Sequence, residues 1–184
     1  MATIRPGTQP VLMIVDVQNG VMQECHNAAQ TVANVARTVD RARAAQVPVI
    51  WVQHESDELP RDSEAWHWVP ELVPAAGEAR VYKRFNSAFE QTDIDDLLAR
   101  LGASHIVLAG AQSNWCIRAS AYGALERGYD LTLVKDAHTT SDLDLGNGAS
   151  IDAATVVRDL NVTMKWLEYP GRRNRIASAE EVEF

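Results

Sequence analysis

The sequence predicts an α/β fold with three layers, in which helices cover both faces of a mostly parallel sheet of about six strands. The first observation is that short apolar runs alternate about six times with segments of helical period along the 184 residues. The second is that the apolar runs are continuous, which is typical of strands buried on both faces. No repeat, low-complexity tract or linker interrupts the alternation, so we expect one domain over residues 1–184.

The first strand–helix–strand unit is predicted within residues 11–54. VLMIVD at 11–16 forms the first strand, and residues 27–45 repeat apolar or small side chains at helical spacing, which predicts an amphipathic helix. Pro48 then precedes the second strand, VIWVQH at 49–54. Residues 55–79 show no clear hydrophobic periodicity, which indicates a long loop. The tryptophans within it favour an ordered loop.

The second half of the chain continues the alternation. Residues 80–83 predict a weak third strand, and Thr92 begins a helix that Gly102 ends. The remaining predicted elements are a strand at 105–110, a helix from Cys116 to about Gly128, a strand at 130–136, a helix at about 150–160 and a last strand, VTMKWL, at 162–167.

Composition narrows the class of partner. A net charge of −8 and a pI near 5.1 argue against a nucleic-acid surface or an anionic membrane, which leaves a small-molecule substrate. No apolar run approaches the roughly 20 residues that span a bilayer, and no signal-like pattern begins the sequence, so we expect a cytoplasmic protein. Cys25 and Cys116 are too few for a disulfide framework or a zinc site, and both are expected as thiols.

Three reactive side chains follow predicted strands. Asp16 ends the first strand, Lys83 ends the third, and Cys116 follows the fourth at the start of a helix, where the thiolate is favoured. Each has an ordinary structural alternative, namely a loop cap, a solvated lysine and a packed thiol. Because ligands of such sheets bind beyond the carboxyl ends of the strands, the three together predict a nucleophilic site.

Four motifs carry a resemblance to a known family. They are IVDVQNG at 14–20, KRFNSAF at 83–89, GAQSNWCI at 110–117 and GYDLTLVKDAHTT at 128–140. In order and spacing they resemble the isochorismatase-like cysteine hydrolases, in the branch of metal-independent amidohydrolases. The resemblance covers residues 10 to about 170 and implies hydrolysis of an amide or related C–N bond of a small molecule through a thioester, with no cofactor.

The resemblance also implies a role for each site residue. Cys116 is the expected nucleophile, Asp16 the general acid and base, and Lys83 the cation that lowers the pKa of the thiol. A cis peptide bond is expected between Ala111 and Gln112, and the backbone N–H groups of Gln112 and Cys116 are then expected to form an oxyanion hole.

Metal binding is not expected. Relatives with nicotinamidase activity hold a metal through an Asp-x-His pair after the second strand, where this chain has Val52-Gln53-His54-Glu55 and lacks the aspartate. His54 and His67 have no strong ligand spacing and are interpreted as solvated or hydrogen-bonded side chains.

Four residues are expected to line the mouth of the site and bind substrate: Gln18, Phe85, Phe89 and Trp115. His138 is a further candidate for a hydrogen bond to substrate. Exposed aromatic side chains and the family resemblance predict a homodimer or homotetramer.

Two alternative functions stay open at this level. One is a carbamoyl, ureido or lactam hydrolase with the same machinery, because the pattern Tyr169-Pro170-Gly171 is similar to a bacterial branch that includes streptothricin hydrolase. The other is a non-catalytic member of the fold in which Cys116 senses redox state.

Overall fold

The computed structural model describes residues 5–184, and a six-stranded parallel sheet runs through its centre. The strand order is β3-β2-β1-β4-β5-β8, and every neighbouring pair is parallel. The strands are β1 (Gln9–Val15), β2 (Val49–His54), β3 (Ala79–Lys83), β4 (Ala103–Ala111), β5 (Asp130–Thr139) and β8 (Asn174–Ala177). The predicted fold class is confirmed.

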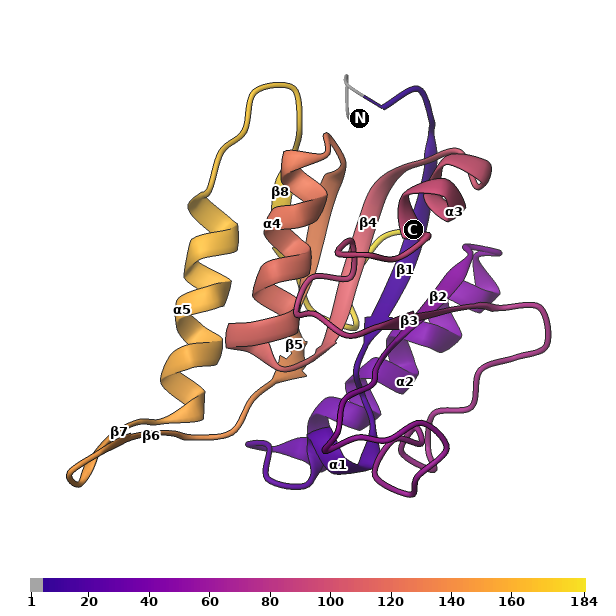
Figure 1. Ribbon diagram of the computed structural model, residues 1–184. Helices are drawn as coiled ribbons and strands as arrows, with labels where there is room; N and C mark the ends of the chain where they lie inside the picture. Colours follow the sequence, from indigo (N-terminus) through magenta and orange to yellow (C-terminus); the bar gives the residue numbers. More distant parts are fainter. Residues whose placement is uncertain (1–4) are drawn as a thin grey trace.

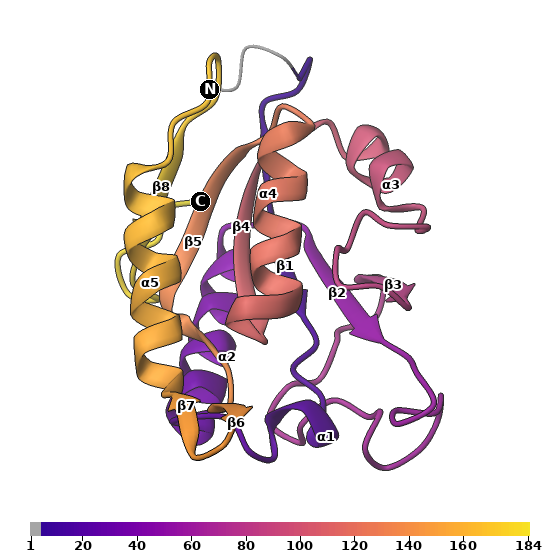
Figure 2. The same ribbon diagram turned by 60° about the vertical axis from the view of Figure 1, so that its left-hand side comes forward.

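Helices form a layer on each side of this sheet (Figures 1 and 2). α2 (Ala28–Ala44) covers one face, while α3 (Ile94–Arg100), α4 (Arg118–Glu126) and α5 (Ala153–Trp166) cover the other. β1 shows the division: Leu12 and Ile14 pack in the cluster that includes α2, and Met13 and Val15 pack in the cluster that includes α4. Both faces of β1 are therefore buried, which explains its continuous apolar sequence.

The predicted last strand at 162–167 is wrong. Residues 162–166 are the end of α5, which begins after Asp152, whose carboxylate accepts a hydrogen bond from the Thr155 N–H. Val156, Leu160 and Met164 recur every four residues and are buried, so the helical period continues through the apparent strand. The sixth strand of the sheet is instead β8, which follows the Pro-Gly turn.

Smaller elements gather at the carboxyl ends of the strands (Figure 1). They are α1 (Asn19–Met22), the π-helical turn η1 (Ser113–Ile117) and the antiparallel hairpin of β6 (Leu143–Gly146) and β7 (Ala149–Ile151). Residues 55–78 form the expected ordered loop, which pairs back to the end of β1 through a bridge between Gln18 and Trp68.

The order of the strands places a crevice between β1 and β4. The chain runs outward from β1 through β2 to β3 on one side and from β4 through β5 on the other, so these two neighbours form the switch point of the sheet. Asp16 follows β1 and Gln112 follows β4, so the predicted site residues lie at the position where sheets of this kind bind ligands. Within residues 5–184, the helices are too short or too polar to cross a bilayer.

Candidate active site

The ends of three strands bring Asp16, Lys83 and Cys116 into contact. Lys83 Nζ lies 2.6 Å from Asp16 Oδ2 and 3.2 Å from Cys116 Sγ. Asp16 and Lys83 are each 1% exposed, and Cys116 is 9% exposed. The ammonium therefore bridges the carboxylate and the thiol in a site from which most water is excluded.

Backbone geometry at the crevice positions the carboxylate. Asp16 has a φ of 53°, in the left-handed region that a residue other than glycine rarely adopts. Beside it, Gly110 has a φ of 129°, and a Cβ there would lie 2.0 Å from the Val15 carbonyl oxygen. Only glycine allows β4 to approach β1 this closely just before the loop that carries Cys116.

The sequence predicted Cys116 in the first turn of an α-helix, but the residue lies in η1. The Ile117 N–H donates to the Gln112 carbonyl five residues earlier at 3.1 Å, and α4 begins only at Arg118. Such π-helical turns are rare and occur often at functional sites.

His138 holds the start of η1 and does not line the pocket. Its ring lies between the Ser113 hydroxyl, 2.8 Å from Nδ1, and Asn161 Oδ1, 3.1 Å from Nε2. Because Asn161 donates its amide to the Lys135 carbonyl, its Oδ1 accepts, which assigns the proton to Nε2 and leaves Nδ1 to accept from Ser113. Burial lowers the pKa of His138 to about 4, so the neutral ring is the stable form.

His54 also belongs to the cluster, although the sequence analysis gave it no catalytic role. It is paired in register with Lys83 on the neighbouring strand, and its Nδ1 lies 3.1 Å from Lys83 Nζ. Burial and the nearby ammonium lower the pKa of His54, so the neutral ring accepts a hydrogen bond from Lys83. The position of His54 at the end of a predicted strand was the signal for its place in the site.

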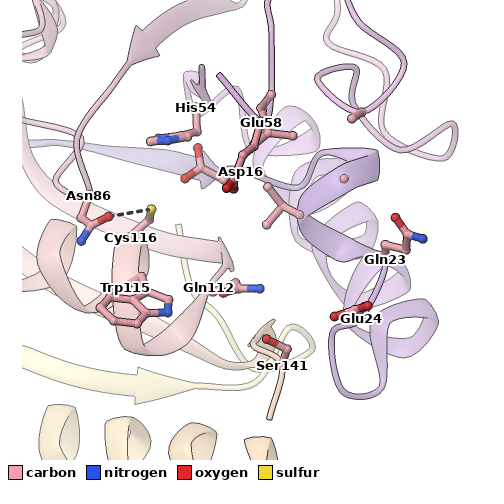
Figure 3. Close-up of a pocket in the computed structure, with 14 residues that line it drawn as sticks. Asp16, Gln23, Glu24, His54, Glu58, Asn86, Gln112, Trp115, Cys116 and Ser141 are labelled. Carbon is pink, nitrogen blue, oxygen red and sulfur yellow. Dashed lines mark hydrogen bonds between the residues drawn. The ribbon is translucent and has the colours of Figure 1, made fainter. Parts of the chain in front are cut away.

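Asn86 was also missed. Its Oδ1 lies 4.0 Å from Cys116 Sγ, at the limit of a sulfur hydrogen bond (Figure 3). The signal was again available, because Asn86 belongs to the KRFNSAF motif that begins with Lys83.

Lys83 acts to lower the pKa of the Cys116 thiol, as expected, but other effects outweigh it in the resting site. Burial and the Asp16 carboxylate raise the pKa of Cys116 to about 12, although Lys83 acts in the opposite direction. The first physical reason is that burial penalises the charged thiolate, and the second is that the one buried ammonium is already paired with the Asp16 carboxylate. The resting site therefore holds a neutral thiol beside the ion pair of Asp16 and Lys83.

Lys83 also bears on metal binding. One ligand atom from each of Asp16, His54 and Cys116 lies within 4.8 Å of the others, a spacing that a metal ion can use. The ammonium nitrogen stands 2.6, 3.1 and 3.2 Å from these three groups and so occupies the space that the ion needs. These residues do not fit a metal while Lys83 is in place, and His67 is exposed and lies outside the group.

A pocket of about 560 Å³ opens onto the thiol (Figure 3). Trp115 lines it and is 50% exposed. The other three predicted substrate-binding residues do not line it in the part of the chain that the structure describes. Phe89 is buried in the core and stacks on Tyr129, and Phe85 is 46% exposed elsewhere. Gln18 is buried, and its amide is hydrogen-bonded to the backbone of His54 and Trp66.

The peptide bond between Ala111 and Gln112 is cis. Gln112 lines the pocket beside Cys116, and no backbone carbonyl among residues 5–184 accepts a hydrogen bond from its N–H. Its side-chain amide donates instead to Cys25 Sγ at 3.6 Å. The Gln112 N–H is therefore available to a ligand at the thiol.

The sequence profile of the isochorismatase domain matches residues 10–161 of the chain. The chain belongs to the isochorismatase family. The match begins in β1 and ends within α5, so it includes every residue of the Asp16–Lys83–Cys116 cluster. The protein is therefore an isochorismatase-family hydrolase.

Individual members of the isochorismatase family are similar over most of this chain. Streptothricin hydrolase from Streptomyces noursei is 32% identical over 155 residues, which cover 81% of this chain and 61% of that protein. A secreted isochorismatase effector of Verticillium dahliae is 27% identical over 155 residues, which cover 80% of this chain and 79% of that protein. The crystal structure of an isochorismatase from Pseudomonas putida KT2440 matches with a TM-score of 0.83 at 27% identity, covering 95% of this chain and 92% of that one.

Proposed function

We propose that the protein hydrolyses an amide or related C–N bond of a small molecule, with Cys116 as the nucleophile. The contact that carries this proposal is the bridging ammonium of Lys83, 2.6 Å from Asp16 Oδ2 and 3.2 Å from Cys116 Sγ, because both of these partners line the pocket. A carboxylate beside a neutral thiol supplies a base for the nucleophile, and the lysine gives the buried carboxylate a counter-charge.

In the first half of the reaction, Asp16 takes the proton of the thiol as Cys116 Sγ attacks the carbonyl carbon. The negative charge passes from the carboxylate to the carbonyl oxygen, so the site never holds two anions beside one ammonium. The backbone N–H groups of Gln112 and Cys116 donate to this oxyanion. Asp16 then returns its proton to the leaving nitrogen, the C–N bond breaks and a thioester remains.

The second half consumes water. Asp16, again ionised, takes a proton from a water molecule whose oxygen attacks the thioester carbonyl. The C–S bond breaks, the proton returns to sulfur, and the carboxylic acid leaves. His54 accepts a hydrogen bond from Lys83 at 3.1 Å and so helps to hold the ammonium in place through both halves.

The substrates to be tested include more than simple amides. Relatives of this chain include a streptothricin hydrolase at 32% identity and a ureidoacrylate amidohydrolase at 27%, so the lactam and ureide alternatives belong in a substrate panel together with open amides. The panel is assayed by release of ammonia or amine, and ring opening of the lactams is followed by chromatography.

Cys116→Ala and Cys116→Ser test the proposal, with Cys25→Ala as the matched control. Cys25 and Cys116 are each 9% exposed, so the two alanine variants remove equally buried thiols. We expect turnover to fall at least about 1000-fold in both Cys116 variants and to persist in Cys25→Ala. Undiminished hydrolysis by folded Cys116→Ala refutes the proposal, and a protein whose thiol is oxidised reversibly but which turns over no compound of the panel supports the redox-sensing alternative.

A further inference from the structure

The pocket above Cys116 has an acidic wall. Glu24, just after α1, and Glu58, in the loop after β2, both line it (Figure 3). Figure 3 shows Glu24 across the pocket from Trp115 and Glu58 at the upper edge of the pocket. No lysine or arginine among the described residues lines the pocket, so this wall sets its charge.

Neither carboxylate is neutralised by the protein. Glu24 and Glu58 are exposed, and within residues 5–184 neither makes an ion pair or a side-chain hydrogen bond. The arginines of the adjoining loops are engaged elsewhere: Arg61 lies over the Tyr82 ring at 4.0 Å, and Arg84 pairs with Glu55 at 2.8 Å. Two anionic groups therefore face the pocket without a cation.

The rest of the pocket does not offset this charge. The charge of Asp16 is balanced by Lys83 at 2.6 Å, and His54 is neutral because its pKa is lowered. Asp16 Oδ1 is buried, lines the same pocket and has no hydrogen-bond partner among the described residues, so it remains able to accept from a ligand. Trp115, half exposed at the rim, adds a ring face that attracts cations.

We infer that the substrate of this site is a small cationic amide, whose carbonyl meets Cys116 while an ammonium or guanidinium group at its far end pairs with Glu24 and Glu58. This inference rests on the proposed function and adds the substrate class to it. The arrangement separates two tasks, because the buried cluster is electrically balanced for catalysis and the exposed carboxylates select charge. The overall charge of −8 further favours the approach of cations over anions.

Three amides of equal length test the substrate class: 6-aminohexanamide, 6-hydroxyhexanamide and adipic acid monoamide. Their far ends are cationic, neutral and anionic, while the amide group is the same. We expect kcat/KM to decrease in that order, by about tenfold between the cationic and the neutral probe, and the preference to shrink as salt is raised. Binding of each probe to the wild-type protein is measured by calorimetry in parallel, so that the test does not depend on turnover.

Glu24→Gln, Glu58→Gln and the double variant remove the acidic wall without changing its shape. Glu126→Gln is the matched control, because Glu126 is exposed, makes no side-chain hydrogen bond or ion pair in the described chain and lies at the end of α4 remote from η1. We expect the double variant to raise KM for the cationic probe about tenfold, to leave kcat nearly unchanged, and to leave the neutral probe unaffected. Glu126→Gln is expected to match the wild type.

The outcomes separate this inference from the proposed function. If Cys116→Ala abolishes hydrolysis but the double variant keeps the wild-type order of the three probes, the inference on the substrate class is wrong and the proposed function stands. If the cationic probe binds no more tightly than the neutral one, the inference is also overturned. Hydrolysis that survives Cys116→Ala contradicts the proposed function itself.

Discussion

Lys83→Met removes the central charge of the site while preserving the length of the side chain. Lys83 is 1% exposed and lies 2.6 Å from Asp16, which is equally buried, so the substitution leaves a carboxylate without a counter-charge in the protein interior. Loss of one partner of a buried ion pair typically costs about 3–5 kcal/mol. Because a domain of this size is stable by about 5–15 kcal/mol, the variant should fold but with much of its margin lost.

The double variant Lys83→Met/Asp16→Asn is the control for this reasoning. It removes the uncompensated carboxylate together with the ammonium, so we expect it to recover at least about half of the lost free energy of unfolding. Neither variant should show turnover, because one lacks the counter-charge of the base and the other lacks the base.

Urea unfolding followed by tryptophan fluorescence measures the free energy of unfolding, and amine release measures turnover. A loss of less than about 1 kcal/mol in Lys83→Met alone would refute the predicted dependence of Asp16 on the ammonium. A double variant that is no more stable than Lys83→Met has the same consequence.

Two further predictions concern the thiol and the crevice. The pKa of Cys116 is raised to about 12 from an ordinary value of 9.0, so its contribution to stability is complete below pH 9 and is lost as the pH rises toward 12. The alkaline decrease in the free energy of unfolding should therefore be smaller in Cys116→Ala; equal slopes contradict the assignment. In Gly110→Ala, a Cβ would lie 2.0 Å from the Val15 carbonyl oxygen, so we expect a loss of more than about 3 kcal/mol and of activity, whereas wild-type melting behaviour would contradict this close approach.

The sequence was sufficient to predict those features that depend on the pattern of a single strand or helix. Continuous apolar runs predicted the buried strands, and the exits of three of them predicted the cluster of Asp16, Lys83 and Cys116. It failed at residues 162–167, because a short apolar run fits a strand and the end of a helix equally well, and only the buried series of Val156, Leu160 and Met164 distinguishes them.

The residues that shape the pocket were harder to predict for a different reason. Phe89 and Trp115 are both aromatic and both lie in the recognised motifs, yet one is 5% exposed in the core and the other is 50% exposed at the pocket. Which way each side chain points depends on how its loop packs after the strands have assembled, and residue type alone does not report this.

By itself, the sequence determined the layered α/β architecture and the identity of the reactive side chains, because periodicity and residue chemistry are local properties. The tertiary structure decided what surrounds them. It placed the Lys83 ammonium between the Asp16 carboxylate and the Cys116 thiol, and burial together with the Asp16 charge raises the pKa of the thiol above its ordinary value. It also set Glu24 across the pocket from Trp115, because the loops that meet around a pocket are decided by how the strands assemble in space.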